Sequence, residues 1–469
     1  MDIAALKQAC KGIVATAHDA NFLELIHGNL WNRLIPDRAP QIVVRINGEQ
    51  DVIAAILFAR ENNLKVVVRG GGHNWCQPTL RNSGMLIDLS NLNKVISIDP
   101  VARKAVVQPV ISNRDIQKTL NAHGLAYPSG HCPQVKLSGY LLGGGMSWNQ
   151  GVWGHGAASV EAVELVTAEG KLITASKDEN QDYFWAARGA GSGFFGVATR
   201  YHLKLYPLPK AIHGCSYYYP LEEAATIAKW LGETAGKLAP SVELSLFLLT
   251  APPELKAVAA SQGGKVCLVT AASFADSPEQ AKAELALLDD CPVIAKKLSY
   301  SPPGPVNFEG LFDASGALWP EGLRNRVQAI FSNSDPKDLV QTMVGHLISA
   351  PSPISLILFV FFTGPDLPPK LTEGAFSMSA RMYGGPWTQW KDAGDDEANS
   401  AWHRECVARL TPFIQGYYIG ESDTASSSSV APGAFSPGNW KRLSALRAKY
   451  DPEGVFFDYF DGFSDPKRS

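Results

Sequence analysis

Two glycine-rich segments, each beside one side chain that can act as a nucleophile, constrain this chain more than any other feature. The first, residues 69–74 (RGGGHN), directly follows Leu64–Arg69, a β-branched run typical of a strand. Glycine lets a backbone bend freely and approach a ligand closely, and successive exposed N–H groups suit an anion such as pyrophosphate. Taken alone, this segment fits a ligand-binding loop and a plain strand-to-loop turn about equally well.

The second segment spans residues 129–135 (SGHCPQV) and is followed by Gly139 and by the triple glycine at 143–145. A single cysteine such as Cys132 is more often an inert buried thiol than a functional group. The two segments together favour a functional role for Cys132, because a histidine after three glycines is followed along the chain by a cysteine and then by three further glycines. The two segments together indicate one shared ligand site.

The length of 469 residues exceeds what one hydrophobic core supports, so we expect two or three domains. The first 35 residues have apolar positions at helical spacing and are predicted to be helical. Gln41–Ile46 and Leu64–Arg69 are predicted strands on either side of a helix at Gln50–Glu61, and this mixture continues to Pro207 and Pro209. From about 210 to 412, helices alternate with strands, which predicts an α+β domain with an antiparallel sheet covered by helices.

Composition excludes several classes of function. The net charge of -3 gives no basic surface for nucleic acid, and no apolar run is long enough to span a membrane. No secretory signal is evident, so the cytoplasm is the expected location. The seven cysteines are scattered without a CxxC pair, which argues against a disulfide framework or a metal site.

With both segments in view, the sequence resembles the berberine bridge enzyme-like flavoproteins of the vanillyl-alcohol oxidase superfamily. That family has a PCMH-type FAD-binding domain and the pattern G-x-C-P-x-V-x-x-x-G-x-x-x-G-G-G. The matching positions are Gly130, Cys132, Pro133, Val135, Gly139, Gly143, Gly144 and Gly145. The resemblance implies an FAD held by two covalent bonds, an 8α-histidyl bond at His73 and a 6-S-cysteinyl bond at Cys132.

More of the chain fits this family. Residues 184–189 (FWAARG) and 193–197 (GFFGV) resemble one family stretch, and residues 439–456 resemble the closing segment. The resemblance implies an FAD-binding domain at 1–209, with a PCMH-type core at about 36–209. It further implies a substrate-binding domain at 210–412 and a C-terminal segment, 413–469, that returns to the FAD domain.

The resemblance identifies a set of cofactor-binding residues. They are His73, Cys132, Arg69, Gly70, Gly71, Gly72, Asn74, Ser129, Gly130, Val135, Gly139, Gly143, Gly144, Gly145, Gly196, Val197 and Asn439. Gly191–Gly196 also matches GxGxxG, but a dinucleotide fingerprint needs a strand before the glycines and a helix after them. Here a helix-like segment precedes and a strand follows, so we reject a nicotinamide site.

The activity implied is oxidation of a small organic substrate by hydride transfer to flavin N5, with molecular oxygen as acceptor and hydrogen peroxide as product. The substrate would be an alcohol, a sugar, an amine or a natural-product intermediate. By analogy, Val135 leaves room for oxygen near flavin C4a, although it also fits ordinary strand packing. A dehydrogenase with another acceptor and a non-catalytic drug-binding flavoprotein remain alternatives, and the oligomeric state is left open.

A tyrosine in a G-x-Y-x-N segment acts as the base in several family members, and residues 416–420 (GYYIG) match it in part. Tyr418 is therefore the candidate base, although Gly420 replaces the usual asparagine and an aromatic pocket wall is an equal interpretation. Tyr417 is a weaker candidate. Glu421 is another candidate, but the interpretation as an exposed loop carboxylate is favoured. The aromatic residues Tyr383, Trp387 and Trp390 could face substrate but are more often core.

Overall fold

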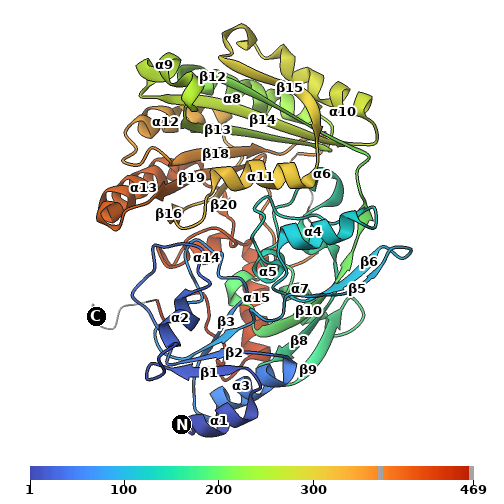
Figure 1. The fold of residues 1–469 in the computed structure, drawn as a ribbon, viewed down its shortest axis with the longest axis vertical. Helices are drawn as coiled ribbons and strands as arrows, with labels where there is room; N and C mark the ends of the chain where they lie inside the picture. Colours follow the sequence, from blue (N-terminus) through green and yellow to red (C-terminus); the bar gives the residue numbers. More distant parts are fainter. Residues whose placement is uncertain (368–370, 372, 464–469) are drawn as a thin grey trace.

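The computed structural model describes residues 1–367, 371 and 373–463. In Figure 1 the first part of the chain forms the lower body, and a large sheet with its helices forms the upper body. The mixture of helices with a separate antiparallel sheet confirms the predicted α+β class and the sheet covered by helices.

The lowest layer is a small sheet in the order β1-β2-β4-β3. β4 lies between β2 and β3 and is parallel to both, and α3 connects β2 to β3 as predicted. The elements of this layer are α1 (Ile3–Ala9), β1 (Ile13–Thr16), α2 (Phe22–His27), β2 (Ile42–Arg45), α3 (Glu49–Glu61), β3 (Val66–Arg69) and β4 (Met85–Asp88).

The prediction that the first 35 residues are helical is wrong in part. Residues 13–16 form β1, which pairs antiparallel with β2 and extends the small sheet at its edge. Ile13 fitted the helical spacing by coincidence, because a short β-branched run next to an open strand edge gains backbone hydrogen bonds as a strand.

A second sheet, antiparallel throughout, has the order β5-β6-β10-β8-β9. Its strands are β5 (Val95–Asp99), β6 (Lys104–Val107), β8 (Val160–Thr167), β9 (Leu172–Ser176) and β10 (Gly196–Lys204). Around it lie α4 (Asn113–Asn121), β7 (Leu125–Ala126), α5 (Leu137–Leu142), α6 (Gln150–Trp153), α7 (Gln181–Ala186) and β11 (Tyr206–Pro207). α7 ends before β10 begins, so the helix-then-strand order around the GxGxxG match is confirmed.

The large sheet runs β15-β12-β14-β13-β18-β19-β17-β20, with β16 also paired to β19. Its strands are β12 (Ala211–Pro220), β13 (Val242–Thr250), β14 (Lys265–Ala275), β15 (Ser299–Val306), β16 (Arg324–Val327), β17 (Ile330–Ser332), β18 (Leu356–Phe361), β19 (Met382–Trp390) and β20 (Gly416–Tyr417). Its helices are α8 (Ala224–Thr234), α9 (Lys256–Ala259), α10 (Pro278–Leu285), α11 (Phe308–Leu318), α12 (Pro336–Ile348) and α13 (Asp396–Leu410).

Side-chain alternation gives this sheet two different faces. In β13, Leu244, Leu246 and Leu248 belong to the same core cluster as residues of α8 and α12. The residues between them, including Ser245 and Phe247, face the opposite way and line a cavity. Helices α8 and α12 therefore cover one face, whereas the other face, beside which α11 lies, is left for the site (Figure 1).

The C-terminal part of the chain touches both bodies. β20 pairs with β17 in the large sheet, and α14 (Val430–Gly433) and α15 (Pro437–Tyr450) follow. The Arg447 guanidinium, on α15, donates to the carbonyls of Gly193 and Phe456, and Phe456 forms a parallel bridge with Val66 of β3.

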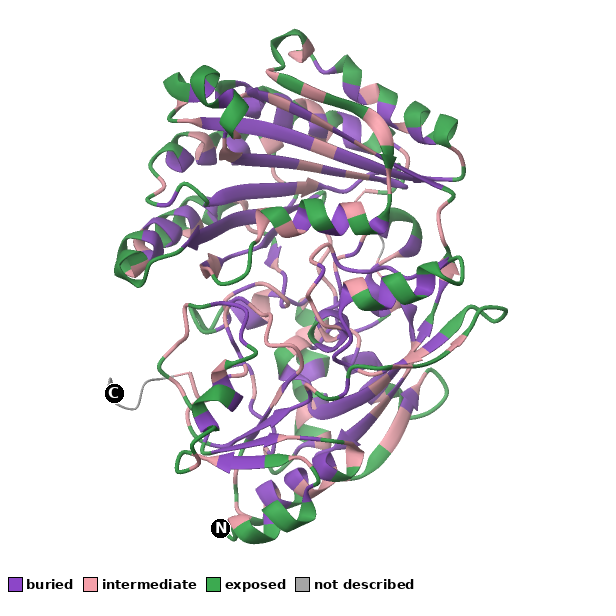
Figure 2. Cartoon of the chain, in the orientation of Figure 1, coloured by how far each residue is buried: buried purple, intermediate pink, exposed green. Residues whose placement is uncertain are grey.

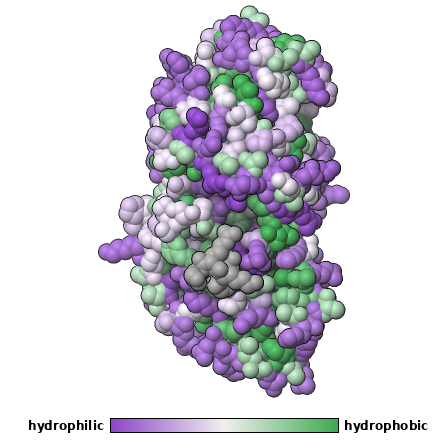
Figure 3. All heavy atoms as spheres, turned by 90° about the vertical axis from the view of Figure 1, so that its left-hand side faces the viewer, coloured by the Kyte–Doolittle hydropathy of each residue, from purple (hydrophilic) through white to green (hydrophobic). Residues whose placement is uncertain are grey.

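Figure 2 shows buried residues concentrated along the strands of both bodies and exposed residues on the outer helix faces. On the face drawn in Figure 3, hydrophobic residues form separate patches and no continuous band. Within the described part of the chain, no helix has the length and apolar character needed to span a membrane.

Candidate functional site

His73 and Cys132 meet although 59 positions separate them in the sequence. His73 stands on the loop after β3, and Cys132 stands on the loop between β7 and α5. The His73 Nε2 atom lies 3.4 Å from the Cys132 Sγ atom. Gly72 permits this approach because its φ is 68°, where a Cβ atom would lie 2.3 Å from the Asn29 carbonyl oxygen.

The two side chains line one large cavity of about 720 Å³ between the bodies. It extends from Val66 and Phe456 in the lower body, past both glycine-rich loops, to Leu358 and Trp387 on the free face of the large sheet. A volume of this size is within the range of cofactor and drug-sized ligand sites.

The predicted cofactor residues divide into two groups. Those that line the cavity are His73, Cys132, Gly70, Gly71, Gly72, Asn74, Gly130, Val135, Gly139 and Gly196. Those that are not part of its wall are Arg69, Ser129, Gly143, Gly144, Gly145, Val197 and Asn439. Asn439, for example, donates from its side chain to the carbonyls of Gly374 and Ala375, which fixes the chain without facing the cavity.

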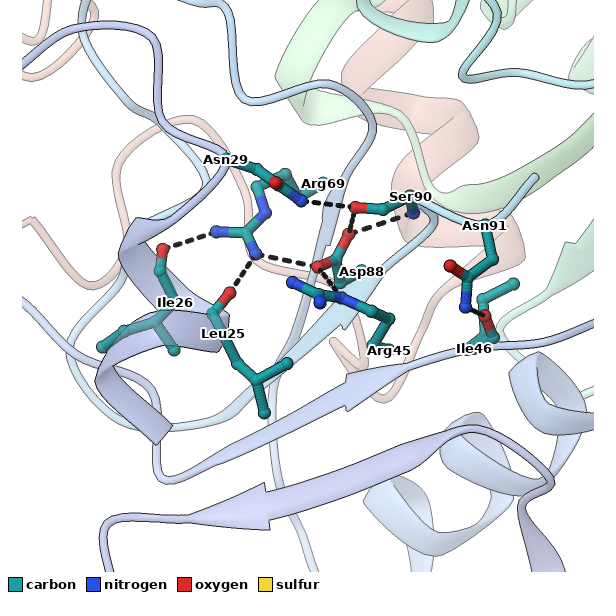
Figure 4. Close-up of polar contacts among 9 residues, drawn as sticks. All are labelled: Leu25, Ile26, Asn29, Arg45, Ile46, Arg69, Asp88, Ser90 and Asn91. Atoms are coloured by element: carbon teal, nitrogen blue, oxygen red, sulfur yellow. Dashed lines mark hydrogen bonds and ion pairs between the residues drawn. The ribbon is translucent and has the colours of Figure 1, made fainter. Parts of the chain in front are cut away.

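The structure gives Arg69 a role different from the predicted one. Its guanidinium is fully buried beside Asp88, at an N–O distance of 2.9 Å, and donates to the carbonyls of Leu25 and Ile26 (Figure 4). The Asp88 carboxylate also accepts from Arg45 at 3.0 Å. A buried charge needs such partners, so Arg69 braces the start of the His73 loop, and it is not part of the cavity wall.

Tyr418 lies in the cavity wall with its hydroxyl group fixed by the second glycine loop. The backbone N–H groups of Gly145 and Met146 lie 3.1 and 3.4 Å from the Tyr418 oxygen, which accepts from both. Burial and the nearby Glu421 raise the pKa of Tyr418, and these two N–H donors oppose that shift. Gly145 thus belongs to the site through its backbone, as a donor to the candidate base.

The interpretation of Glu421 as an exposed loop carboxylate is wrong. Glu421 lines the cavity and accepts a hydrogen bond from the Tyr383 hydroxyl, and burial raises the pKa of its carboxyl group. Tyr383 and Trp387 also line the cavity, whereas Trp390 lies outside its wall and donates to Asp396 at 2.7 Å. A loop with no periodic pattern gave no signal of where Glu421 would point.

Another polar group in the cavity wall was not predicted from the sequence. His131 Nε2 lies 3.4 Å from a Glu243 oxygen, and the His131 ring packs on Trp148 with centroids 4.0 Å apart. The buried Nε1 of Trp148 and Nε2 of Gln150 have no hydrogen-bond partner within the described residues. These two donors can therefore bind an acceptor in the cavity.

The comparisons with known proteins agree with this geometry. Residues 40–176 match the family model described as "FAD binding domain". The chain is 26% identical over 445 residues to the FAD-linked oxidoreductase nodO of Hypoxylon pulicicidum, which covers 93% of this chain and 94% of the relative. It is 27% identical to the uncharacterized FAD-linked oxidoreductase YvdP of Bacillus subtilis, over 95% of this chain and 96% of the relative.

Solved structures show the same fold over the whole length. The 6-hydroxy-D-nicotine oxidase of Arthrobacter nicotinovorans superimposes with a TM-score of 0.82 at 22% identity, covering 97% of this chain and 98% of that one. The berberine bridge enzyme-like protein 1 of Physcomitrella patens gives a TM-score of 0.79 at 17% identity, with 98% of each chain covered. The chain is an FAD-dependent oxidoreductase, and it shares its fold with a berberine bridge enzyme-like protein.

The cavity of this oxidoreductase fits an FAD. Gly139 lines the cavity, and a Cβ atom at that position would meet no other atom within 4 Å. Any side chain there would therefore occupy the space that a cofactor needs. Glycines at 70–72 and 130 line the same cavity with bare backbone, which suits close approach to a phosphate chain.

Burial acts in opposite directions on the two nucleophiles of the flavoprotein. It lowers the pKa of His73 to about 4, so the imidazole is neutral at pH 7 and a ring nitrogen is free to attack. It raises the pKa of the Cys132 thiol to about 11, so the thiol is protonated at pH 7. At pH 7 the His73 ring therefore has a free nitrogen lone pair, whereas the Cys132 side chain keeps its thiol proton.

Proposed function

We propose that this oxidoreductase binds its FAD through an 8α-histidyl bond at His73 and a 6-S-cysteinyl bond at Cys132. It would oxidise a small organic substrate, such as an alcohol, a sugar, an amine or a natural-product intermediate. The observation that carries the proposal is the 3.4 Å separation of His73 Nε2 and Cys132 Sγ at the wall of one cavity. The C8 methyl and C6 belong to the same flavin ring, so side chains this close can bond to both.

The bound flavin supplies an acceptor for a hydride at N5, and the protein orients the substrate and moves its proton. Tyr418 is the proposed proton acceptor for a substrate hydroxyl or amine. It can act as one only after its own phenol proton has left, because burial and the nearby Glu421 raise its pKa. Its oxygen already accepts from the N–H groups of Gly145 and Met146, and this arrangement stabilises the phenolate that forms when Tyr418 loses its proton. The opposite wall, with Tyr383, Trp387 and Leu358, gives an apolar surface for the substrate body.

We propose molecular oxygen as the electron acceptor, with hydrogen peroxide as the product. Val135 supports this, because it lines the cavity three residues after Cys132, where a small side chain leaves room beside the flavin. A structural neighbour, the pollen allergen Phl p 4, is a glucose dehydrogenase as wild type and a glucose oxidase as a variant in which valine replaces an isoleucine.

Replacing Val135 by leucine tests the acceptor. The added methylene group should lower the rate of peroxide release by about tenfold, the low end of what one methylene does in a tight pocket. Turnover with an artificial acceptor dye should stay close to wild type, because the dye does not need space at flavin C4a. Wild-type protein that reduces the dye but releases no peroxide in air would instead identify a dehydrogenase.

The two covalent bonds are expected to form with different pH dependence. In a His73→Ala variant only the cysteinyl bond can form, and its rate should rise about tenfold per pH unit from pH 7 to 9 as the thiolate fraction grows. In a Cys132→Ala variant the histidyl rate should be flat over the same range, because the pKa of His73, about 4, lies well below it. The measurement is flavin retained after acid precipitation at timed intervals following addition of FAD to apoprotein. Cysteinyl attachment that is independent of pH would contradict the thiol pKa of about 11.

A further inference from the structure

The segment that follows α2 lies directly against the loop that carries His73. The indole ring of Trp31 stacks on the imidazole ring of His73, with centroids 4.8 Å apart and an angle of 29° between the planes. The Trp31 backbone N–H donates to the Gly72 carbonyl at 3.0 Å. Ring and backbone of one residue thus fix both the side chain of His73 and the turn before it.

This segment is itself anchored to the strand that leads into the loop. Arg69, four residues before His73, donates to the carbonyls of Leu25 and Ile26 at the end of α2 (Figure 4). The Asn29 side chain donates to Ser90 at 2.7 Å, just after β4. The position of Trp31 relative to His73 is therefore set by hydrogen bonds on both sides.

Trp75 contacts both rings, and its centroid lies 6.1 Å from that of His73 at an interplanar angle of 83°. Trp75 meets the Trp31 ring edge-on, with centroids 4.7 Å apart and an interplanar angle of 81°. The Asn32 side chain donates to the carbonyls of Trp75, at 2.6 Å, and Asn325, at 2.9 Å. Trp31 is only 7% exposed. A buried indole held by these contacts can keep a neighbouring ring in one plane.

Packing alone would explain a buried tryptophan, but not its stacking on the one imidazole that faces Cys132. We propose that Trp31 is a positioning residue for covalent flavin attachment: its indole face holds the His73 ring so that a nitrogen points at the flavin C8 methyl group. This inference rests on the proposed histidyl bond. Sequence patterns gave no sign of it, because Trp31 precedes the expected core of the FAD-binding domain.

Trp31 would promote formation of the covalent bond between His73 and the flavin C8 methyl group. A bond forms between the imidazole nitrogen and the methyl carbon, and one C–H bond and one N–H bond are lost. The two electrons reduce the flavin ring, and dissolved oxygen then reoxidises it to yield hydrogen peroxide. A ring nitrogen held out of line would slow this step, since misplacing reacting atoms by 1 Å costs on the order of 100-fold in rate.

The test uses two substitutions of Trp31 in two backgrounds. In Cys132→Ala protein, where only the histidyl bond can form, Trp31→Leu should slow covalent attachment of added FAD by about 100-fold. Trp31→Phe, which keeps an aromatic face, should attach FAD at close to the parent rate. In His73→Ala protein, Trp31→Leu should leave cysteinyl attachment unchanged. Attachment is read as flavin fluorescence retained on the denatured chain over time, with bound FAD measured before denaturation.

Three other results would contradict either this inference or the proposed histidyl bond. Equal histidyl rates for the leucine variant and its parent would overturn the inference, as would a loss of cysteinyl attachment in the leucine variant, because the effect would then be general damage. If Cys132→Ala protein with native Trp31 attaches no flavin at all, the proposed histidyl bond itself is wrong. A failure of the Trp31 inference can therefore be distinguished from a failure of the proposed histidyl bond.

Discussion

Replacing both His73 and Cys132 by alanine is expected to release all FAD when the protein is denatured, whereas wild-type protein should retain all of it. Each single variant should keep the flavin attached through the remaining side chain, because the two atoms are 3.4 Å apart and each is proposed to bond to the same ring. The measurement is flavin absorbance in the pellet and in the supernatant after acid precipitation.

Cys76→Ala is the matched control for this experiment. Cys76 is three residues after His73 on the same loop, but it is not part of the cavity wall. Its replacement should leave attachment unchanged. A single variant that already releases all of its flavin would show that the protein forms only one covalent bond.

Replacing Tyr418 by phenylalanine is expected to slow reduction of the flavin by substrate by at least about 100-fold, the usual contribution of a positioned base. The phenol oxygen is removed while the ring remains in the cavity wall, so FAD content should not change. The measurement is anaerobic stopped-flow bleaching of the flavin absorbance with a substrate found by a peroxide-release screen.

Tyr417→Phe provides the control, because Tyr417 is adjacent in sequence but does not line the cavity. If substrate reduces the flavin of the Tyr418→Phe variant at the wild-type rate, a group other than Tyr418 accepts the substrate proton. Glu421 would then be the next candidate, since its buried carboxyl group has a raised pKa and lies within reach of the same space.

The sequence predicted the part of the site that depends on local motifs. One glycine-rich loop carries His73 and the other carries Cys132, and this pattern predicted that both side chains share one ligand site. The structure brings His73 and Cys132 together. The α+β class and the helix-covered sheet followed from periodic patterns, which local propensity controls strongly.

Side-chain direction was not predictable in the same way. Arg69 stands next to three glycines in sequence, yet its guanidinium turns away into a buried ion pair with Asp88. The partners that decide this direction are Asp88 and the end of α2, which are distant in sequence. The burial of Glu421 and the role of Trp31 were missed for the same reason, because both depend on contacts made by the tertiary fold.

Mass spectrometry of the denatured wild-type protein after tryptic digestion tests directly whether one FAD is bonded to both His73 and Cys132. Trypsin should release residues 70–81, which contain His73, and residues 119–136, which contain Cys132. We expect one species in which a single FAD joins both peptides, with neither peptide found free. Recovery of both peptides unmodified, with the FAD in solution, would contradict it.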